Sequence, residues 1–211
     1  MEIEAIRKRV NLCRDIRSTM KDAGGRKLAE RPHQFRDLLA PESHAVFISS
    51  VSSERRPYLP FERVGADTIA SNLNFALYDA PDWCMGLIAS RLHFVWIGTV
   101  CGRLKSDFRY SNTLGWNTFP VPKFTEDQHL ALTRSAMSIL RCRISHHPKT
   151  IAQLYDPDEM PDDLRAAHKA NDDLLESMYI GRPFRNDTER LEHLFKLYAA
   201  RVKKLKKGGT T

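Results

Sequence analysis

The sequence has few cysteines, and none of them lies close to another. The four are Cys13, Cys84, Cys101 and Cys142. A zinc ribbon or a dithiol redox motif needs a close cysteine pair, so this spacing excludes both kinds of site. We expect all four residues to be reduced thiols.

Long hydrophobic runs are also missing. No stretch approaches the roughly 20 apolar residues that span a bilayer. The first ten residues, MEIEAIRKRV, carry charges where a secretory signal would have its apolar core. The sequence therefore favours a cytoplasmic protein without a membrane partner.

The composition is that of a globular protein with a basic charge balance. Hydrophobic residues make up 42% of the 211 residues and charged residues 28%, which argues against intrinsic disorder. The length suits one large domain or two small ones. Lys and Arg outnumber Asp and Glu by 33 to 26, a formal net charge of +7, and this excess favours a polyanionic partner such as nucleic acid.

The first 122 residues mix helix and strand patterns. Apolar residues recur every three or four positions from Ile3 to Met20, which predicts an amphipathic helix that ends before Gly24. The runs AVFISSV and FVWIGTV are rich in β-branched and aromatic residues and favour strands. Between them, PDWCMGLIASRLHF predicts a short helix with Asp82 as its cap.

The prolines in NTFPVPKF indicate a domain boundary, because each proline blocks helix continuation. We place the first domain at 1–122 and a helical domain at 123–211. Three helices are expected in the second domain: one after a capping box at Thr125, one from Pro161 and one after Asn186. Together they would form a small bundle, and the predicted fold class is α+β.

Three long phrases carry a family resemblance: SSERRPYLPF, CGRLKSDFRYSNTLGWNTFPVP and LYDPDEMPDDLRAAHKANDDLLESMY. In this order they resemble the C-terminal part of the MmeI-like (type IIL) fused restriction-modification enzymes. The resemblance implies a target-recognition domain followed by a C-terminal helical domain. It also implies a parent protein that methylates adenine N6 in DNA, with or without an endonuclease, and that takes part in phage defence.

The catalytic motifs of such a parent are not found in this sequence. There is no glycine-rich turn that would bind S-adenosylmethionine, no NPPY-type motif and no nuclease cluster. A methyltransferase must hold its methyl donor and a flipped base in a pocket. We therefore expect this chain to bind no cofactor, to catalyse nothing alone, and to be an expressed fragment or a truncated reading frame of a larger protein.

The best candidates for base reading are Lys105, Asp107 and Arg109. Alternation at two-residue spacing would place all three on one face of a strand. A lysine can donate to guanine O6 and N7, while a carboxylate can accept from the cytosine amino group of the same pair. The resemblance implies that these positions determine bases of the target site. The alternative is a solvated strand edge with a local ion pair.

Some candidates for contacts with the DNA backbone flank this segment, and two others lie in the phrase SSERRPYLPF. Arg103, Tyr110 and Ser111 supply donors that commonly contact phosphates, and Arg55 with Arg56 suits a phosphate-contacting loop. Two alternatives stay open. Tyr110 could be a half-buried aromatic with a satisfied hydroxyl. Glu54 could pair with Arg55 or Arg56 in a structural loop.

Other conspicuous phrases have structural explanations. Trp116, Phe119 and Pro120 predict a packed junction between the two domains. The acidic residues around Pro161 complement the positive end of a helix dipole, and their spacing predicts no metal site.

The leading hypothesis is therefore sequence-specific recognition of duplex DNA. A second hypothesis is a structural module that docks on the methyltransferase domain of the parent or on a partner subunit. A free-standing hydrolase or nuclease is a third reading, but no paired catalytic residues favour it.

Overall fold

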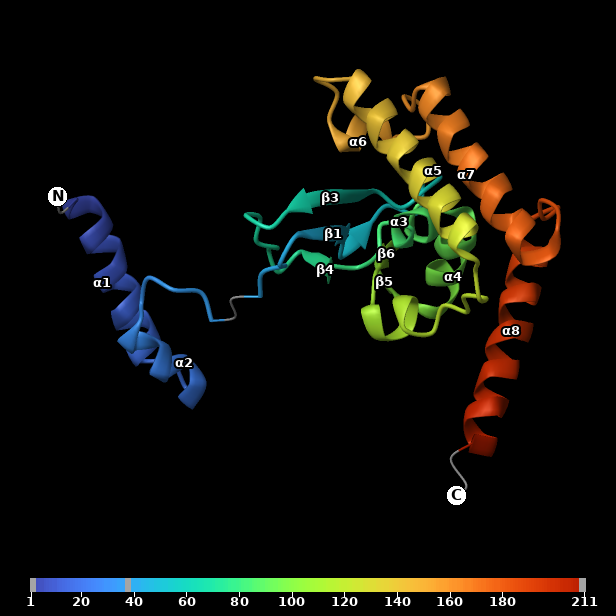
Figure 1. The fold of residues 1–211 in the computed structure, drawn as a ribbon. Helices are drawn as coiled ribbons and strands as arrows, with labels where there is room; N and C mark the ends of the chain where they lie inside the picture. Colours follow the sequence, from blue (N-terminus) through green and yellow to red (C-terminus); the bar gives the residue numbers. More distant parts are fainter. Residues whose placement is uncertain (1–2, 37–38, 209–211) are drawn as a thin grey trace. The chain divides into compact units, whose positions relative to one another are not determined.

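The computed structural model describes residues 3–36 and 39–208 of the chain (Figure 1). The chain divides into two compact units, Met1–Ala40 and Pro41–Thr211. In the described part of the chain, no helix has both the length and the apolar character needed to cross a bilayer.

The first unit is a small helical assembly. The predicted N-terminal helix is confirmed as α1, Glu4–Ser18, and it is followed by α2, Ala23–Lys27, and the 3-10 turn η1, Leu28–Glu30. The guanidinium group of Arg17 donates to three backbone carbonyls between Leu28 and Gln34, at 2.8 to 3.3 Å. These bonds tie the end of α1 to the segment after α2.

The second unit contains two small antiparallel sheets, and the strands of the two sheets are interleaved along the chain. Strand β1, His44–Ser49, lies between β3, Phe61–Gly65, and β4, Asn74–Tyr78. In the other sheet β6, Asp107–Arg109, lies between β2, Val51–Ser52, and β5, Gly102–Leu104.

Ser50 alone separates β1 from β2, and its carbonyl accepts from the Tyr110 amide at 2.9 Å. The strand predicted from AVFISSV is confirmed, and it links the two sheets.

The strand favoured for FVWIGTV is wrong, because this run lies in a helix. The structure has α3, Cys84–Ile88, and α4, Arg91–Val100. Ser90 caps α4 by accepting from the His93 amide at 3.1 Å. All residues from Leu92 to Ile97 are buried, so the run lacks the polar positions that reveal helical periodicity. Asp82 caps no helix and instead accepts from Arg63 Nε at 2.8 Å.

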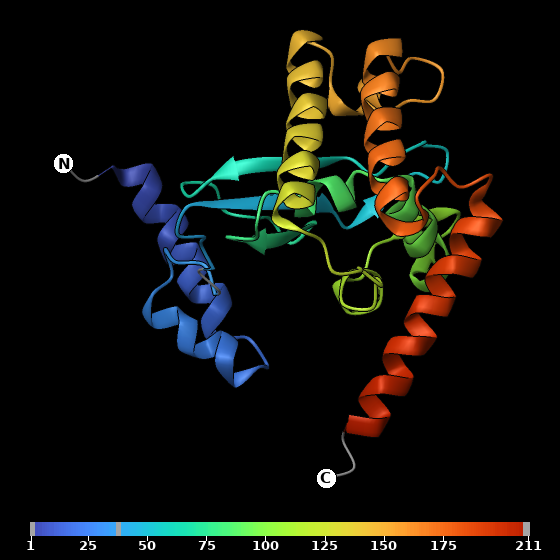
Figure 2. The same cartoon turned by 45° about the vertical axis from the view of Figure 1, so that its right-hand side comes forward.

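The helical C-terminal region consists of α5, Glu126–Ser145, α6, Ile151–Leu154, α7, Asp162–Ile180, and α8, Asp187–Gly208. The capping box at Thr125 is confirmed: its side chain and that of Gln128 each bind the other residue's backbone amide. Helices α5 and α7 lie side by side, whereas α8 packs mainly against α4 (Figures 1 and 2). The α+β class, with a mixed region followed by a helical region, is confirmed.

Large apolar residues of α5 do not all lie on its buried face. Leu130 and Ile144 are 49% and 73% exposed. The buried face instead carries Leu132, Ala136, Ile139 and Arg143. Arg143 is buried because it bonds to the Phe61 carbonyl and the Glu62 carboxylate, an ion pair that a hydrophobic pattern cannot predict.

Two hydrophobic clusters form the core of the second unit. One joins the sheets to α3, α5 and the start of α7, and the other joins α3 and α4 to α7 and α8. Trp116 packs against both, and Phe119 is 2% exposed in the second, as expected for a packed junction. The core thus runs across residue 122, and a boundary between separate domains there stays a prediction.

Candidate nucleic-acid interface

The segment predicted to read bases forms a tight β-hairpin. Leu104 of β5 pairs with Asp107 of β6, so only Lys105 and Ser106 are left for the turn. Lys105 adopts a left-handed backbone conformation with φ of 57°. The expectation that Lys105 shares a strand face with Asp107 and Arg109 is therefore wrong, because Lys105 lies at the tip of the hairpin.

The two faces of the hairpin differ in character. Phe108 is 7% exposed and packs edge-on against Phe94, with ring centroids 5.2 Å apart. Since side chains alternate along a strand, Asp107 and Arg109 point to the opposite, outer face. Within the described part of the chain, no hydrogen bond or ion pair engages the side chains of Lys105, Asp107 or Arg109. The hairpin thus presents three charged groups that have no partner among the residues that the structure describes.

Arg103 has a different position from these three. It pairs with Phe108 across the hairpin, and its guanidinium carbon lies 4.8 Å from the centre of that ring. The same group donates to Glu54 at 2.6 Å and to the Ser106 carbonyl at 2.7 Å. Arg103 therefore braces the turn and joins the hairpin to the loop that follows β2.

Tyr110 is a core residue. It is 4% exposed, and its hydroxyl is hydrogen-bonded to His93 Nε2 at 3.1 Å. Burial raises the pKa of Tyr110 and lowers the pKa of His93 to about 3, so both rings are neutral at pH 7. The burial argues against the expected phosphate contact, because no phosphate can reach a hydroxyl inside the core. The alternative interpretation, an aromatic with a satisfied hydroxyl, fits the structure.

Ser111 is half-buried and begins the single π-helical turn η2, Asn112–Trp116. Its hydroxyl oxygen accepts from the Leu114 amide at 3.2 Å. The hydroxyl can still donate to another acceptor, because a serine oxygen accepts and donates at the same time.

The loop between β2 and β3 carries the two adjacent arginines. Arg55 lies 3.0 Å from Asp158, but both side chains are mostly exposed, at 67% and 78%, so this pair is weak. Arg56 donates to the Ser52 hydroxyl at 3.3 Å. Glu54 pairs with Arg103, so the proposed alternative of a pair within the loop is not what the structure shows.

A buried polar network fixes this loop against α7. The Tyr58 hydroxyl donates to Asp172 at 2.9 Å, and the Tyr58 ring stacks on His168 with centroids 4.2 Å apart. Asp172 also accepts from the Arg91 amide at 2.7 Å. Burial raises the pKa of Asp172 to about 7 despite these bonds.

Two further ion pairs extend the network to α8. Glu176, 1% exposed, accepts from Arg190 at 2.7 Å, and Asp187 accepts from Arg91 at 2.6 Å. Sequence reasoning missed this network because it treated the acidic residues of α7 as charges near a helix start. The available signal was their spacing: His168, Asp172 and Glu176 recur every four residues on one side of α7.

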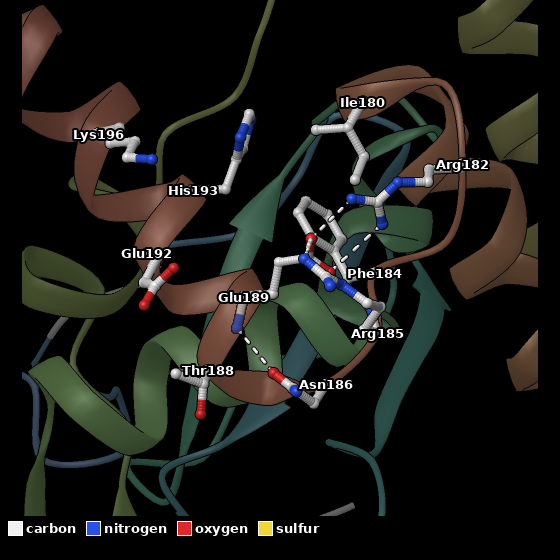
Figure 3. Close-up of a pocket in the computed structure, with 10 residues that line it drawn as sticks. All are labelled: Ile180, Arg182, Phe184, Arg185, Asn186, Thr188, Glu189, Glu192, His193 and Lys196. Carbon is white, nitrogen blue, oxygen red and sulfur yellow. Dashed lines mark hydrogen bonds and ion pairs between the residues drawn. The ribbon is translucent and has the colours of Figure 1, made fainter.

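A hollow of about 660 Å³ lies between the end of α7 and the start of α8 (Figure 3). Arg182 and Arg185 both point to Glu189, at 2.7 and 3.3 Å, and Asn186 caps α8 by accepting from the Glu189 amide at 2.9 Å. These bonds hold the pKa of Glu189 at about 2. The arginines of the hollow thus have a carboxylate partner already.

With this geometry in place, the chain can be assigned to a class. Residues 1–123 match the family described as MmeI, target recognition domain, and residues 124–206 match MmeI, C-terminal domain. The chain belongs to this family, as the three phrases predicted.

Two individual proteins are similar to this chain over almost its whole length. Over 193 residues it is 40% identical to DNA methyltransferase A of Bacillus subtilis (strain 168), a match that covers 92% of this chain and 22% of the relative. Its fold is similar to a chain in the structure of the type IIL restriction-modification enzyme MmeI in complex with DNA, with a TM-score of 0.87 and 30% identity. That match covers 94% of this chain and 26% of the solved chain, so the chain spans about a quarter of its relatives' length.

Proposed function

We propose that this chain is the sequence-specific, duplex-DNA recognition module of an adenine-N6 DNA methyltransferase or restriction-modification protein. The observation that carries the proposal is the hairpin from Gly102 to Arg109. Its tip and outer face hold Lys105, Asp107 and Arg109 without a partner inside the described chain, whereas nearby Arg103 is paired. Charged groups left free on a braced hairpin suit a partner whose groups complete their hydrogen bonds.

The proposed chemistry follows from the donor and acceptor pattern of the major groove. Lys105 donates to guanine O6 and N7, and Asp107 accepts from the amino group of the paired cytosine. Arg109, on the same face as Asp107, can donate two parallel bonds to a second guanine. A two-stranded ribbon fits the width of the major groove, which suits the hairpin as the reading element.

Backbone contacts are assigned to the cations and hydroxyl that border this hairpin. Arg55, Arg56, Arg103 and Ser111 are the candidates; Tyr110 is omitted because it is buried. The Arg55–Asp158 pair is mostly exposed and can exchange for phosphate, whereas Arg103 and Glu54 are 45% and 43% exposed. The formal net charge of +7 adds sequence-independent attraction.

The methyl transfer itself is assigned to the rest of such a protein. The catalytic parts and the S-adenosylmethionine site would lie in the methyltransferase domain, and this chain would choose the adenine that is modified. Duplex DNA and that domain are the proposed partners, and the cytoplasm is the proposed location.

The test exchanges the charges of the reading pair in a full-length protein that carries this chain. With Lys105→Asp and Asp107→Lys, we expect methylation to continue but at a site in which one base pair has changed. Sequencing of methylated adenines in a random DNA library reads this out. Unchanged site preference in the double variant would contradict the assignment.

A matched control exchanges a lysine and an aspartate at another place on the surface. Lys169 and Asp173 form an exposed pair one turn apart on α7, at 2.5 Å. The exchange Lys169→Asp with Asp173→Lys alters the surface as much as the test variant does, and we expect it to leave the methylated site unchanged.

A second candidate function is docking onto the methyltransferase domain. Within its own unit, α1 leaves Ile6, Leu12 and Ile16 between 53% and 59% exposed, and exposed apolar side chains of this size favour a protein partner. Ile6→Lys with Leu12→Lys would weaken association with a separately supplied methyltransferase domain. Arg55→Ala with Arg56→Ala separates the hypotheses, because only DNA recognition predicts a smaller salt slope of binding.

A further inference from the structure

A cluster of three metal-ligating side chains lies in the helical region, among residues to which the proposed function gives no role. Cys142 is in the last turn of α5, His146 is the residue that caps the end of this helix, and Asp163 is in the first turn of α7. Their ligand atoms all lie within 4.8 Å of one another. His146 Nε2 is 2.8 and 2.9 Å from the two carboxylate oxygens of Asp163. The fold thus brings a thiol, an imidazole and a carboxylate to one point.

The chemistry of this set matches one class of cation. Sulfur, imidazole nitrogen and carboxylate oxygen are the three donor types that Zn²⁺ takes, with bonds of roughly 2.0 to 2.3 Å. A tetrahedral ion with such bonds separates its ligand atoms by about 3.4 Å. The His146–Asp163 distances of 2.8 and 2.9 Å are shorter than that value, and no pair of ligand atoms is more than 4.8 Å apart, so rotation of exposed side chains is enough to admit an ion. Three protein ligands leave a fourth position for water.

Exposure and charge favour entry of a cation from solvent. The Asp163 side chain is 58% exposed and that of His146 is 26% exposed, while Cys142 is half-buried beneath them. The carboxylate of Asp163 supplies the negative charge that attracts a cation. A bound divalent cation would deprotonate the thiol, as metals do with coordinating cysteines.

We propose that Cys142, His146 and Asp163 bind one zinc-class divalent cation, which joins the end of α5 to the start of α7. Cysteine spacing could not reveal the site, because its ligands come from two helices and include a single cysteine. The site shares no residue with the proposed DNA interface and does not depend on that function.

Cobalt substitution tests the site directly. The chain without an affinity tag is titrated with Co²⁺ at micromolar concentration, and absorption is recorded for the d–d bands and for the sulfur-to-cobalt charge-transfer band. We expect one Co²⁺ per chain, a charge-transfer band, and loss of that band when Zn²⁺ is added in equimolar amount. The thermal midpoint should rise with Zn²⁺ and fall again with a chelator, since an ion that binds the folded state stabilises it.

Variants decide whether the signal belongs to this cluster. Cys142→Ser should abolish the charge-transfer band, and Asp163→Asn should weaken Co²⁺ binding at least tenfold. Cys13→Ser is the matched control, because it removes an exposed thiol outside the cluster and should change nothing. Circular dichroism verifies that the variants are folded. No charge-transfer band in the unaltered chain, or a band that persists in Cys142→Ser, would overturn the proposal and leave a hydrogen-bonded cluster only.

Discussion

At the scale of single residues, the polar side chains of this chain differ in whether a partner inside the chain already satisfies them. Arg103 has a carboxylate, a carbonyl and an aromatic ring within reach, and Tyr110 has a buried histidine. Arg109, which directly follows Phe108 on β6, has no such partner in the described chain. Sequence spacing treats these residues alike, whereas their surroundings assign them to bracing, to the core and to the surface.

Tyr110→Phe tests the assignment of this residue to the core. Removal of the hydroxyl leaves His93 Nε2 without its partner in a buried site, so the free energy of unfolding should fall by roughly 1 to 3 kcal/mol. Urea denaturation measures this loss. DNA affinity at a temperature where both proteins are folded should be unchanged. A weaker affinity for DNA with an unaltered free energy of unfolding would instead support a contact between Tyr110 and a phosphate.

Asp172 should make stability depend on pH. Burial raises its pKa from 3.8 to about 7 in the folded chain, so between these values the folded state holds a proton that the unfolded state has lost. This contribution to stability is present below pH 4 and is lost as the pH rises towards 7. Glu176 also raises the pKa, while Arg190 and the Arg91 amide lower it.

Asp172→Asn removes the titrating group and keeps the shape of the side chain. We expect the difference in unfolding free energy between the variant and the original chain to change by a few kcal/mol across this pH window, in favour of the variant at higher pH. Urea denaturation at a series of pH values gives the two profiles. Parallel profiles would show that Asp172 does not titrate in the folded chain.

At the scale of elements, the hairpin packs on the hydrophobic core through one buried ring. Phe108 packs on Phe94 and lies against α4, where a side-chain carbon placed on Gly98 would come within 3.2 Å of the ring. Bonds to β2 fix only one edge of the hairpin. The outer face can therefore vary in chemistry without loss of the fold, which is what a reading surface requires.

Phe108→Ala should release the hairpin from α4. The loss of a buried aromatic ring predicts a decrease of roughly 3 to 5 kcal/mol in unfolding free energy. Leu104→Ala is the control, because Leu104 lies on the same hairpin but is 53% exposed, and its effect should be small. Chemical denaturation of both variants makes the comparison. Equal losses would mean that the hairpin is not anchored through Phe108.

Sequence patterns predicted the elements of this chain better than their contacts. Local signals such as the capping box at Thr125 and the proline before α7 were sufficient to locate helices. The run around Phe94 was misjudged, because a helix buried on all sides has no periodicity. The tip position of Lys105 depends on the pairing of Leu104 with Asp107, a register that spacing alone does not fix.

At the scale of the whole chain, the proposed function is the binding of a polyanion, duplex DNA, by a basic protein with a formal net charge of +7. The family assignment rests on matches that cover almost all of the chain, while the reading residues rest on geometry and chemistry. If Lys105, Arg109 and the bordering arginines contact DNA, binding must release counterions and must weaken as salt is added.

The most direct measurement is the binding of this chain to fluorescently labelled random duplex DNA over a series of salt concentrations, with single-stranded DNA for comparison. The account predicts preference for the duplex and a linear fall of log affinity with log salt, with a slope made smaller by Arg55→Ala and Arg56→Ala. Absence of duplex binding at low salt, or equal binding to single strands with no effect of the arginines, would contradict the central claim.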